Sequence, residues 1–103
     1  MNKEIKTKWL KALRSGRYKQ ARNALHTESG YCCLGVLAKV QRVSDEILKN
    51  RGFLEDDLVE YSAGLSRKSQ RVLSRLNDKE DDDGLPAGKS FKEIADYIEK
   101  HYK

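Results

Sequence analysis

One apolar run constrains the fold of this chain more than any other feature. Residues 30–38 read Gly-Tyr-Cys-Cys-Leu-Gly-Val-Leu-Ala, and they form the one sustained apolar stretch in a sequence that is 36% charged. A core must be built from the few apolar segments available, so this run is expected at its centre. The run also holds both cysteines, Cys32 and Cys33, and side-chain chemistry is therefore sought there first.

The run is predicted to be a buried helix over residues 31–42. It is longer than a usual strand, and its apolar residues recur at the spacing of one helix face. The positions at this spacing are Leu34, Leu37 and Ala38. Cys32 and Cys33 are then expected in the first turn. Gly35 costs a helix about 1 kcal/mol relative to alanine, so it is expected to mark the close approach of another backbone.

Helix signals on both sides of this run predict a mainly α protein. Ser15-Gly16 ends a first amphipathic helix, and Ser90 and Glu93 form a capping box at the start of the last one. The predicted helices span residues 3–14, 31–42, 54–62 and 66–77, and a last one starts at residue 90. The helix over 66–77 has Val72, Leu73 and Leu76 on its inner face.

The segment between the first two helices lacks helical periodicity. Residues 17–30 could form short extended pieces, with a turn by composition at 27–30. The sequence thus predicts a single domain over 1–103, a compact bundle of four to five short helices around the central helix 31–42. A small β-hairpin in 17–30 is possible, which would make the fold α+β.

The acidic segment 78–83 is predicted to be an exposed loop. Asp81, Asp83 and Gly84 follow the order of positions in a calcium loop, but Lys79 and Ser90 stand where that loop needs acidic ligands. A zinc site needs about four ligands at metal spacing, which the two cysteines and two histidines do not offer. No metal and no cofactor is expected.

The cysteines allow one enzymatic hypothesis. A thiol at a helix N-terminus is a potential nucleophile, and His26 is near enough in sequence to act as its base. No strands follow to carry a base and an orienting partner, and free cysteines are among the most buried residues. Cys32 and Cys33 are therefore expected to pack in the core, and the protein is not expected to be an enzyme.

The N-terminal end carries the strongest charge asymmetry. Residues 1–22 contain eight Lys and Arg against one acid, Glu4, in a chain of net charge +5. Such a basic face can steer an anionic partner, and a neighbouring tyrosine can stack on a base. The predicted binding residues are Lys8, Lys11, Arg14, Arg17, Tyr18, Lys19 and Arg22. A solvated amphipathic face is the alternative.

The expected location is a reducing cytosol. The chain starts with charged residues where a secretory signal would be apolar. No segment approaches the roughly 18 apolar residues that a membrane span needs, so no membrane partner is expected. In a reducing compartment the cysteines are expected as free thiols.

Blocks of sequence along most of the chain resemble a family of small proteins encoded by tailed bacteriophages and mobile elements. The blocks are Trp9-Leu10-x-Ala12-Leu13-Arg14-Ser15-Gly16-x-Tyr18-x-Gln20, Gly30-Tyr31-Cys32-Cys33-Leu34-Gly35-Val36-Leu37, Leu65-Ser66 with Leu73 and Leu76-Asn77-Asp78, and Ser90-Phe91-x-Glu93-Ile94-Ala95-Asp96-x-Ile98-Glu99. The resemblance implies no catalytic residue. It implies an accessory phage protein that acts in the host bacterial cytoplasm.

Two main functional hypotheses follow. In the first, the protein binds a host protein or ribonucleoprotein complex through its charged surface and inhibits host defence, as an anti-CRISPR protein does. This is an analogy at the level of a class. In the alternative, the basic N-terminal face binds a nucleic acid or a nucleotide. A thiol enzyme at Cys32 or Cys33 is the third hypothesis, and the target and oligomeric state stay open.

Overall fold

The computed structural model describes residues 1–22, 24–77 and 89–102. Over these residues the protein is mainly α with one small antiparallel sheet, which confirms the predicted fold class. The elements are α1 (Lys3–Arg14), β1 (His26–Thr27), β2 (Gly30–Tyr31), α2 (Cys33–Lys39), α3 (Asp45–Leu48), the 3-10 helix η1 (Asp56–Ser62), α4 (Arg67–Asn77) and α5 (Phe91–His101). The predictions for the acidic segment 78–83, including the calcium-like pattern, lie outside the described residues.

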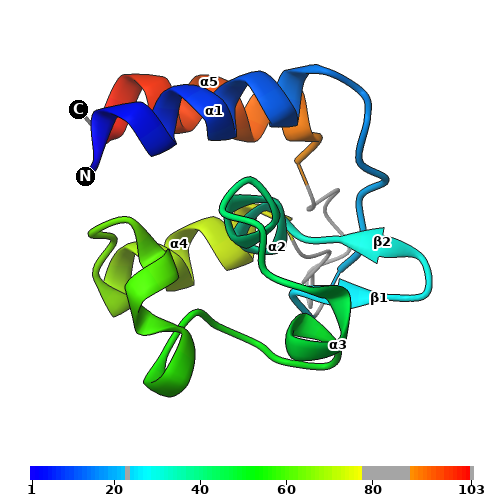
Figure 1. The fold of residues 1–103 in the computed structure, drawn as a ribbon. Coiled ribbons are helices and arrows are strands. Elements are labelled where there is room, and N and C mark those ends of the chain that lie inside the picture. The colour runs from blue at the N-terminus through cyan, green and yellow to red at the C-terminus, as the bar shows by residue number, and fades with distance from the viewer. Residues whose placement is uncertain (23, 78–88, 103) are drawn as a thin grey trace.

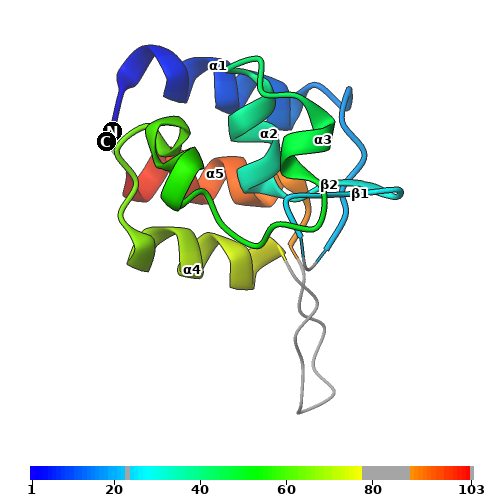
Figure 2. The ribbon, with the colours of Figure 1, turned by 60° about the horizontal axis from the view of Figure 1, so that its bottom comes forward.

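Helix α2 is the centre of the core. Its residues from Cys33 to Ala38 are all buried, and α1 and α4 pack on opposite sides of it (Figures 1 and 2). Burial of so apolar a segment is the main favourable contribution to folding, so the other helices are arranged around it. The predicted central helix is therefore present.

The predicted bounds of this helix, 31–42, were wrong at both ends. Tyr31 belongs to β2, because its backbone N–H donates to the Lys19 carbonyl and its own carbonyl accepts from Ala21. Cys32 is the N-cap, and its Sγ accepts from the Gly35 N–H at 3.4 Å. At the other end the helix stops at Lys39, and the chain then turns through a left-handed residue.

Gly35 sits where another backbone crosses α2, as predicted. A Cβ atom at this position would overlap the backbone carbonyl oxygen of Leu25. That same oxygen accepts a hydrogen bond from the Cys32 N–H at 3.2 Å. The segment before β1 therefore lies directly on the start of α2, and a side chain at residue 35 would push it away.

The predicted hairpin is present as a pair of very short strands. β1 and β2 pair antiparallel, with His26 opposite Tyr31 and Thr27 opposite Gly30. Parallel bridges from Gln20 to Tyr31 and from His26 to Lys49 extend this pairing on both sides. The hairpin is thus tied to the segment after α1 and to the segment after α3.

Capping interactions begin the helices where the sequence predicts them. The Asn2 side chain accepts from the Ile5 N–H at 2.9 Å, and the Ser66 hydroxyl accepts from the Ser69 N–H at 3.1 Å. Ser90 and Glu93 exchange both hydrogen bonds of a capping box. The backbone N–H and hydroxyl of Ser90 hold the pKa of the Glu93 carboxyl below its usual range. The predicted helix over 54–62 is the 3-10 helix η1.

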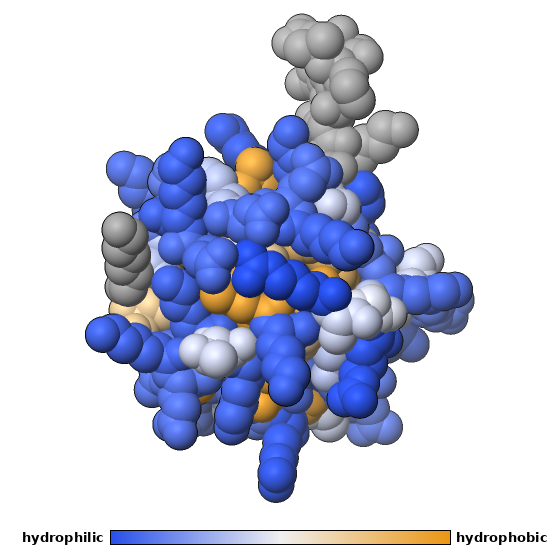
Figure 3. Space-filling model, turned by 90° about the horizontal axis from the view of Figure 1, so that it is seen from above, coloured by the Kyte–Doolittle hydropathy of each residue, from blue (hydrophilic) through white to orange (hydrophobic). Residues whose placement is uncertain are grey.

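Helices α1 and α5 lie side by side, although they come from opposite ends of the sequence (Figures 1 and 2). The Arg14 guanidinium joins them by ion pairs to Asp96 at 2.8 Å and Glu99 at 3.1 Å. Seen from above, the face formed by these helices is largely hydrophilic (Figure 3). Their apolar sides therefore face the core.

Two buried amide side chains brace α4 against the rest of the molecule. Asn77 accepts from the Cys33 N–H and from the Gln20 side chain, and it donates to the Ala21 carbonyl at 2.9 Å. Gln70 pairs through both amide atoms with the backbone of Leu54. Each buried polar group is thus satisfied, which is what burial requires.

Candidate binding groove between α1 and α2

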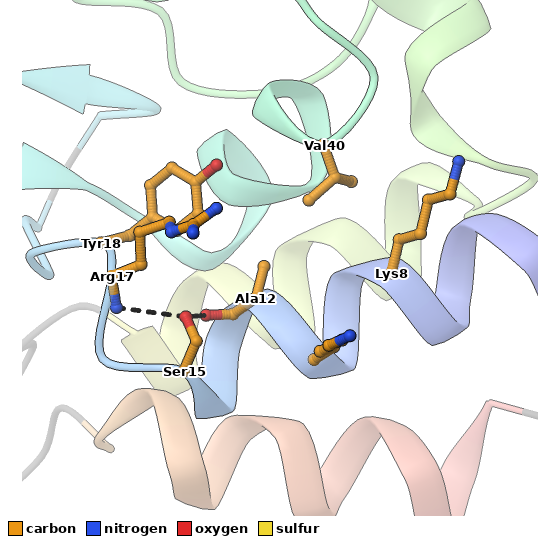
Figure 4. A pocket seen from close by; sticks show the side chains of 7 residues that line it. Lys8, Ala12, Ser15, Arg17, Tyr18 and Val40 are labelled. Carbon is orange, nitrogen blue, oxygen red and sulfur yellow. Dashed lines mark hydrogen bonds between the residues drawn. The ribbon is translucent and has the colours of Figure 1, made fainter.

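A groove of about 560 Å³ lies between α1 and the end of α2. Its lining residues are Lys8, Lys11, Ala12, Ser15, Arg17, Tyr18 and Val40. Figure 4 shows Ala12 and Val40 in the middle of the groove, with Lys8 on one side and Arg17 and Tyr18 on the other. The groove thus combines a small apolar centre with a cationic rim.

The sequence places these residues together through one helix stripe and one turn. Lys8, Lys11, Ala12 and Ser15 follow at i, i+3, i+4 and i+7 on α1, which puts them on one side of the helix. Gly16 then adopts a φ of 74°, and the chain turns so that residues 17 and 18 reach the groove. The Ser15 hydroxyl fixes the turn, because it donates to the Ala12 carbonyl at 2.7 Å and accepts from the Arg17 N–H at 3.1 Å.

The three cations of the groove have no acidic partner among the described residues. Within the part of the chain that the structure describes, Lys8, Lys11 and Arg17 form no ion pair. Three like charges around one hollow repel one another, and an anion placed among them relieves that repulsion. The groove is therefore suited to a negatively charged ligand.

The structure divides the predicted binding residues. Lys8, Lys11, Arg17 and Tyr18 all line the groove. Arg14 points to α5, where hydrogen bonds from its guanidinium to Glu99 and Asp96 raise its pKa. Lys19 and Arg22 lie on the segment that pairs with β2 and are not among the lining residues.

An aromatic cluster positions Tyr18 in the groove. The Tyr18 ring meets the Tyr31 ring edge to face at 5.5 Å, and the His26 ring stacks on Tyr31 at 4.5 Å. The Tyr31 hydroxyl donates to the Asp45 carboxylate at 2.8 Å, and Lys39 forms an ion pair with the same carboxylate at 2.9 Å. Sequence reasoning missed this cluster, because its members come from five separate places in the chain: the segment after α1, β1, β2, α2 and α3.

The electrostatics of the cluster fit a structural brace. Burial, together with the hydrogen bond to Asp45, raises the pKa of Tyr31 to about 12. Hydrogen bonds from Lys39 and Tyr31 hold the pKa of the Asp45 carboxyl below its usual range. At neutral pH the Tyr31 phenol is thus neutral and Asp45 is ionised. His26 donates from Nδ1 to the Gly30 carbonyl at 2.8 Å, since a carbonyl oxygen accepts.

Both cysteines lie in the core. Cys32 is 4% exposed and Cys33 is fully buried, with its Sγ 3.6 Å from the Leu73 carbonyl oxygen. Buried thiols of this kind act as packing groups. Among residues 1–22, 24–77 and 89–102, no cluster of three or more His, Cys, Asp or Glu could hold a metal ion. None of the described helices has the length and apolar character needed to cross a membrane.

The fold and the groove together define a small, mainly helical protein with a cationic groove on its surface. Residues 1–66, nearly two thirds of the chain, match the family model described as "Domain of unknown function (DUF8296)", and the chain belongs to that family. This match contains every residue that lines the groove, whereas α4 and α5 lie beyond it. Searches of curated proteins and of solved structures found no match.

Proposed function

We propose that this protein is a non-enzymatic accessory protein of phage type that binds a host protein or ribonucleoprotein complex through the groove between α1 and α2. The observation that carries the proposal is the set of three cations, Lys8, Lys11 and Arg17, which have no acidic partner among the described residues. An acidic surface of the partner would supply the missing charge, and complementary charges also speed encounter.

The apolar centre of the groove favours a protein partner. Ala12 and Val40 are half-buried side chains between the cations, and they leave room for a small apolar side chain of the partner. Interfaces of this type combine an apolar centre with a charged rim. The ligand would thus be an acidic segment that carries an apolar residue.

The host context rests on the sequence resemblance to phage and mobile-element proteins. Proteins of that class commonly act inside the bacterial cytoplasm on defence complexes, CRISPR effectors among them. We propose that binding of the protein inhibits such a complex. The buried positions of Cys32 and Cys33 support binding over thiol catalysis.

Nucleic-acid or nucleotide binding in the same groove is the second candidate. It is favoured by the Tyr18 ring, which lines the groove on the same side as Arg17 and could stack on a base. The Tyr18 ring is already in edge-to-face contact with Tyr31, so part of its surface is occupied. For this reason a protein partner is preferred.

The test is affinity purification from lysates of several bacterial hosts, followed by reconstitution with the purified partner. We compare the wild type with Lys8→Glu/Lys11→Glu in the groove and with Lys92→Glu/Lys100→Glu, which makes the same charge change on exposed positions of α5. Each lysine change in the groove replaces attraction by repulsion, so the groove variant should lose at least about tenfold in affinity. The α5 variant should bind like the wild type.

Inhibition is then measured directly. The wild type and the α5 variant should suppress the activity of the captured defence complex, whereas the groove variant should not. Equal binding by both variants, or the absence of a partner in every host, would contradict the proposal. Loss of oligonucleotide binding in the groove variant, without loss of a protein partner, would instead support the second candidate.

A further inference from the structure

A second cationic groove runs along the outer side of α4. It has a volume of about 420 Å³. Helix α4, which supplies most of its lining, lies on the opposite side of the molecule from α1 (Figures 1 and 2). Its lining residues are Phe53, Lys68, Arg71, Val72, Ser74 and Arg75. It shares no lining residue with the groove between α1 and α2.

The charge of this groove comes almost entirely from α4. The helix Arg67–Asn77 contains four basic residues and no acid. Arg67 forms an ion pair with Glu55 at 3.3 Å, whereas Lys68, Arg71 and Arg75 form no ion pair with any residue in the described ranges.

The spacing of these three cations makes a row along the helix. They follow at i, i+3 and i+7, so they share one side and lie about 4.5 and 6 Å apart along the axis. A row of positive charges fits a ligand that carries several negative charges in a line.

Phe53 gives the groove an aromatic wall. It is half-buried: part of the side chain packs against the core and the rest lines the groove, and its ring makes no contact with another aromatic ring of the described residues. In this respect it differs from Tyr18 in the first groove, whose ring meets Tyr31. A cationic row beside an aromatic side chain that lines the same groove is the arrangement that binds single-stranded nucleic acid, where phosphates meet the cations and a base stacks on the ring.

We propose that the α4 groove binds single-stranded nucleic acid. Lys68, Arg71 and Arg75 contact successive phosphates, and a base stacks on Phe53. Arginine suits this role because its planar guanidinium binds a phosphate through two hydrogen bonds. Contacts of this kind read charge and stacking, so binding is largely independent of sequence. The site is separate from the groove of the proposed function, so the proposal for α4 can be tested independently of that function.

The test measures binding of a fluorescently labelled oligothymidylate by anisotropy across a series of salt concentrations. A length of about 12 nucleotides is within the span that small single-strand sites cover. With three phosphates engaged, the logarithm of the binding constant should fall with the logarithm of salt at a slope near −2. Arg71→Gln/Arg75→Gln should lower affinity at least about tenfold and reduce the slope to about −0.7.

One further variant tests the aromatic wall, and another is a matched control for the loss of charge. Phe53→Leu keeps the apolar wall but removes the stacking surface, and it should lower affinity about tenfold. Lys92→Gln/Lys100→Gln removes two charges from exposed positions of α5, outside both grooves, and should bind like the wild type. Thermal unfolding of each variant checks that the fold is retained.

Several results would overturn the proposal. These are no binding by the wild type at low salt, wild-type affinity in the α4 variant, and equal affinity for a duplex of the same length. Displacement of the oligothymidylate by poly-glutamate at equal charge concentration would also overturn it, because the groove would then be a general site for acidic chains.

Discussion

The indole nitrogen of Trp9 donates a hydrogen bond to the backbone carbonyl oxygen of Cys33 across 2.8 Å in the core. Trp9 is fully buried, and its partner lies in the first turn of α2. The bond therefore fixes α1, which carries the groove lysines, against α2, whose end carries Val40. The position of one groove wall relative to the other depends on this contact.

Replacement of Trp9 by phenylalanine should destabilise the protein. The change removes the hydrogen bond and leaves a void, so the free energy of unfolding should fall by about 2–4 kcal/mol. Urea unfolding, monitored by far-ultraviolet circular dichroism, measures this free energy of unfolding. Val59→Ala, at an exposed position, is the control and should change stability by less than about 0.5 kcal/mol. A similarly small effect of Trp9→Phe would show that the bond contributes little.

Gly35→Ala tests the close approach of Leu25 to α2. Helix propensity alone predicts a gain of about 1 kcal/mol. The added Cβ overlaps the Leu25 carbonyl oxygen, however, and we expect a net loss of about 2 kcal/mol or more from the forced backbone shift. Gly52→Ala is the matched control, because a Cβ there meets nothing within 4 Å. A stabilised Gly35→Ala variant would refute this close packing.

Native thiol reactivity tests the hypothesis of a nucleophilic cysteine. Cys32 and Cys33 are buried, so iodoacetamide should modify them only through unfolding, at a rate that rises with urea. Mass spectrometry of the native and unfolded protein counts the modified residues. Fast modification of one cysteine in the native state would reopen the enzymatic hypothesis.

Stability at acid pH should depend on Asp45. Its pKa is lowered in the folded state by Lys39 and Tyr31, so its contribution is present above the unfolded value of about 4 and is lost as pH falls further. Asp45→Asn should therefore lose less stability than the wild type on acidification below about pH 4. Glu46→Gln, at an exposed neighbouring position, is the control. Parallel acid unfolding curves for all three proteins would argue against the pairing.

The phenol of Tyr31 should ionise at a higher pH than an ordinary tyrosine. Its pKa is raised to about 12, so the contribution to stability is complete below the ordinary value of about 10 and is lost as pH rises from there. The difference between the alkaline absorbance titrations of the wild type and Tyr31→Phe isolates this residue. A midpoint near 12 is expected. A midpoint near the ordinary value of about 10 would show that burial and Asp45 do not raise the pKa of Tyr31.

The sequence predicted the fold best where a local signal determines structure. The Ser90–Glu93 capping box and the turn at Gly16 act over a few residues, and both are found as expected. Tyr31 was misassigned because its partners, Lys19 and Ala21, lie about ten residues away, and a run of apolar residues does not reveal such pairing.

The proposed binding surface was harder to predict for the same physical reason. Charge counting found the basic end of the chain, but it could not show that Arg14 would meet acids on α5. The cations of α4 were not predicted as a site, because the apolar positions of that helix indicate only its inner side. A helical wheel of α4 shows the row of Lys68, Arg71 and Arg75. It does not show that this row lies beside Phe53, because that arrangement depends on the tertiary structure.

The pairing of α1 with α5 has a consequence for synthesis on the ribosome. Helix α1 is synthesised before the other helices, but it packs against α5, residues 91–101, which are synthesised last among the helices. Until these residues leave the exit tunnel, the apolar side of α1 lacks part of its native packing and is open to chaperones and to premature association. We therefore expect the final closure of the fold to wait until α5 has been synthesised, with its rate set by bringing two distant segments together.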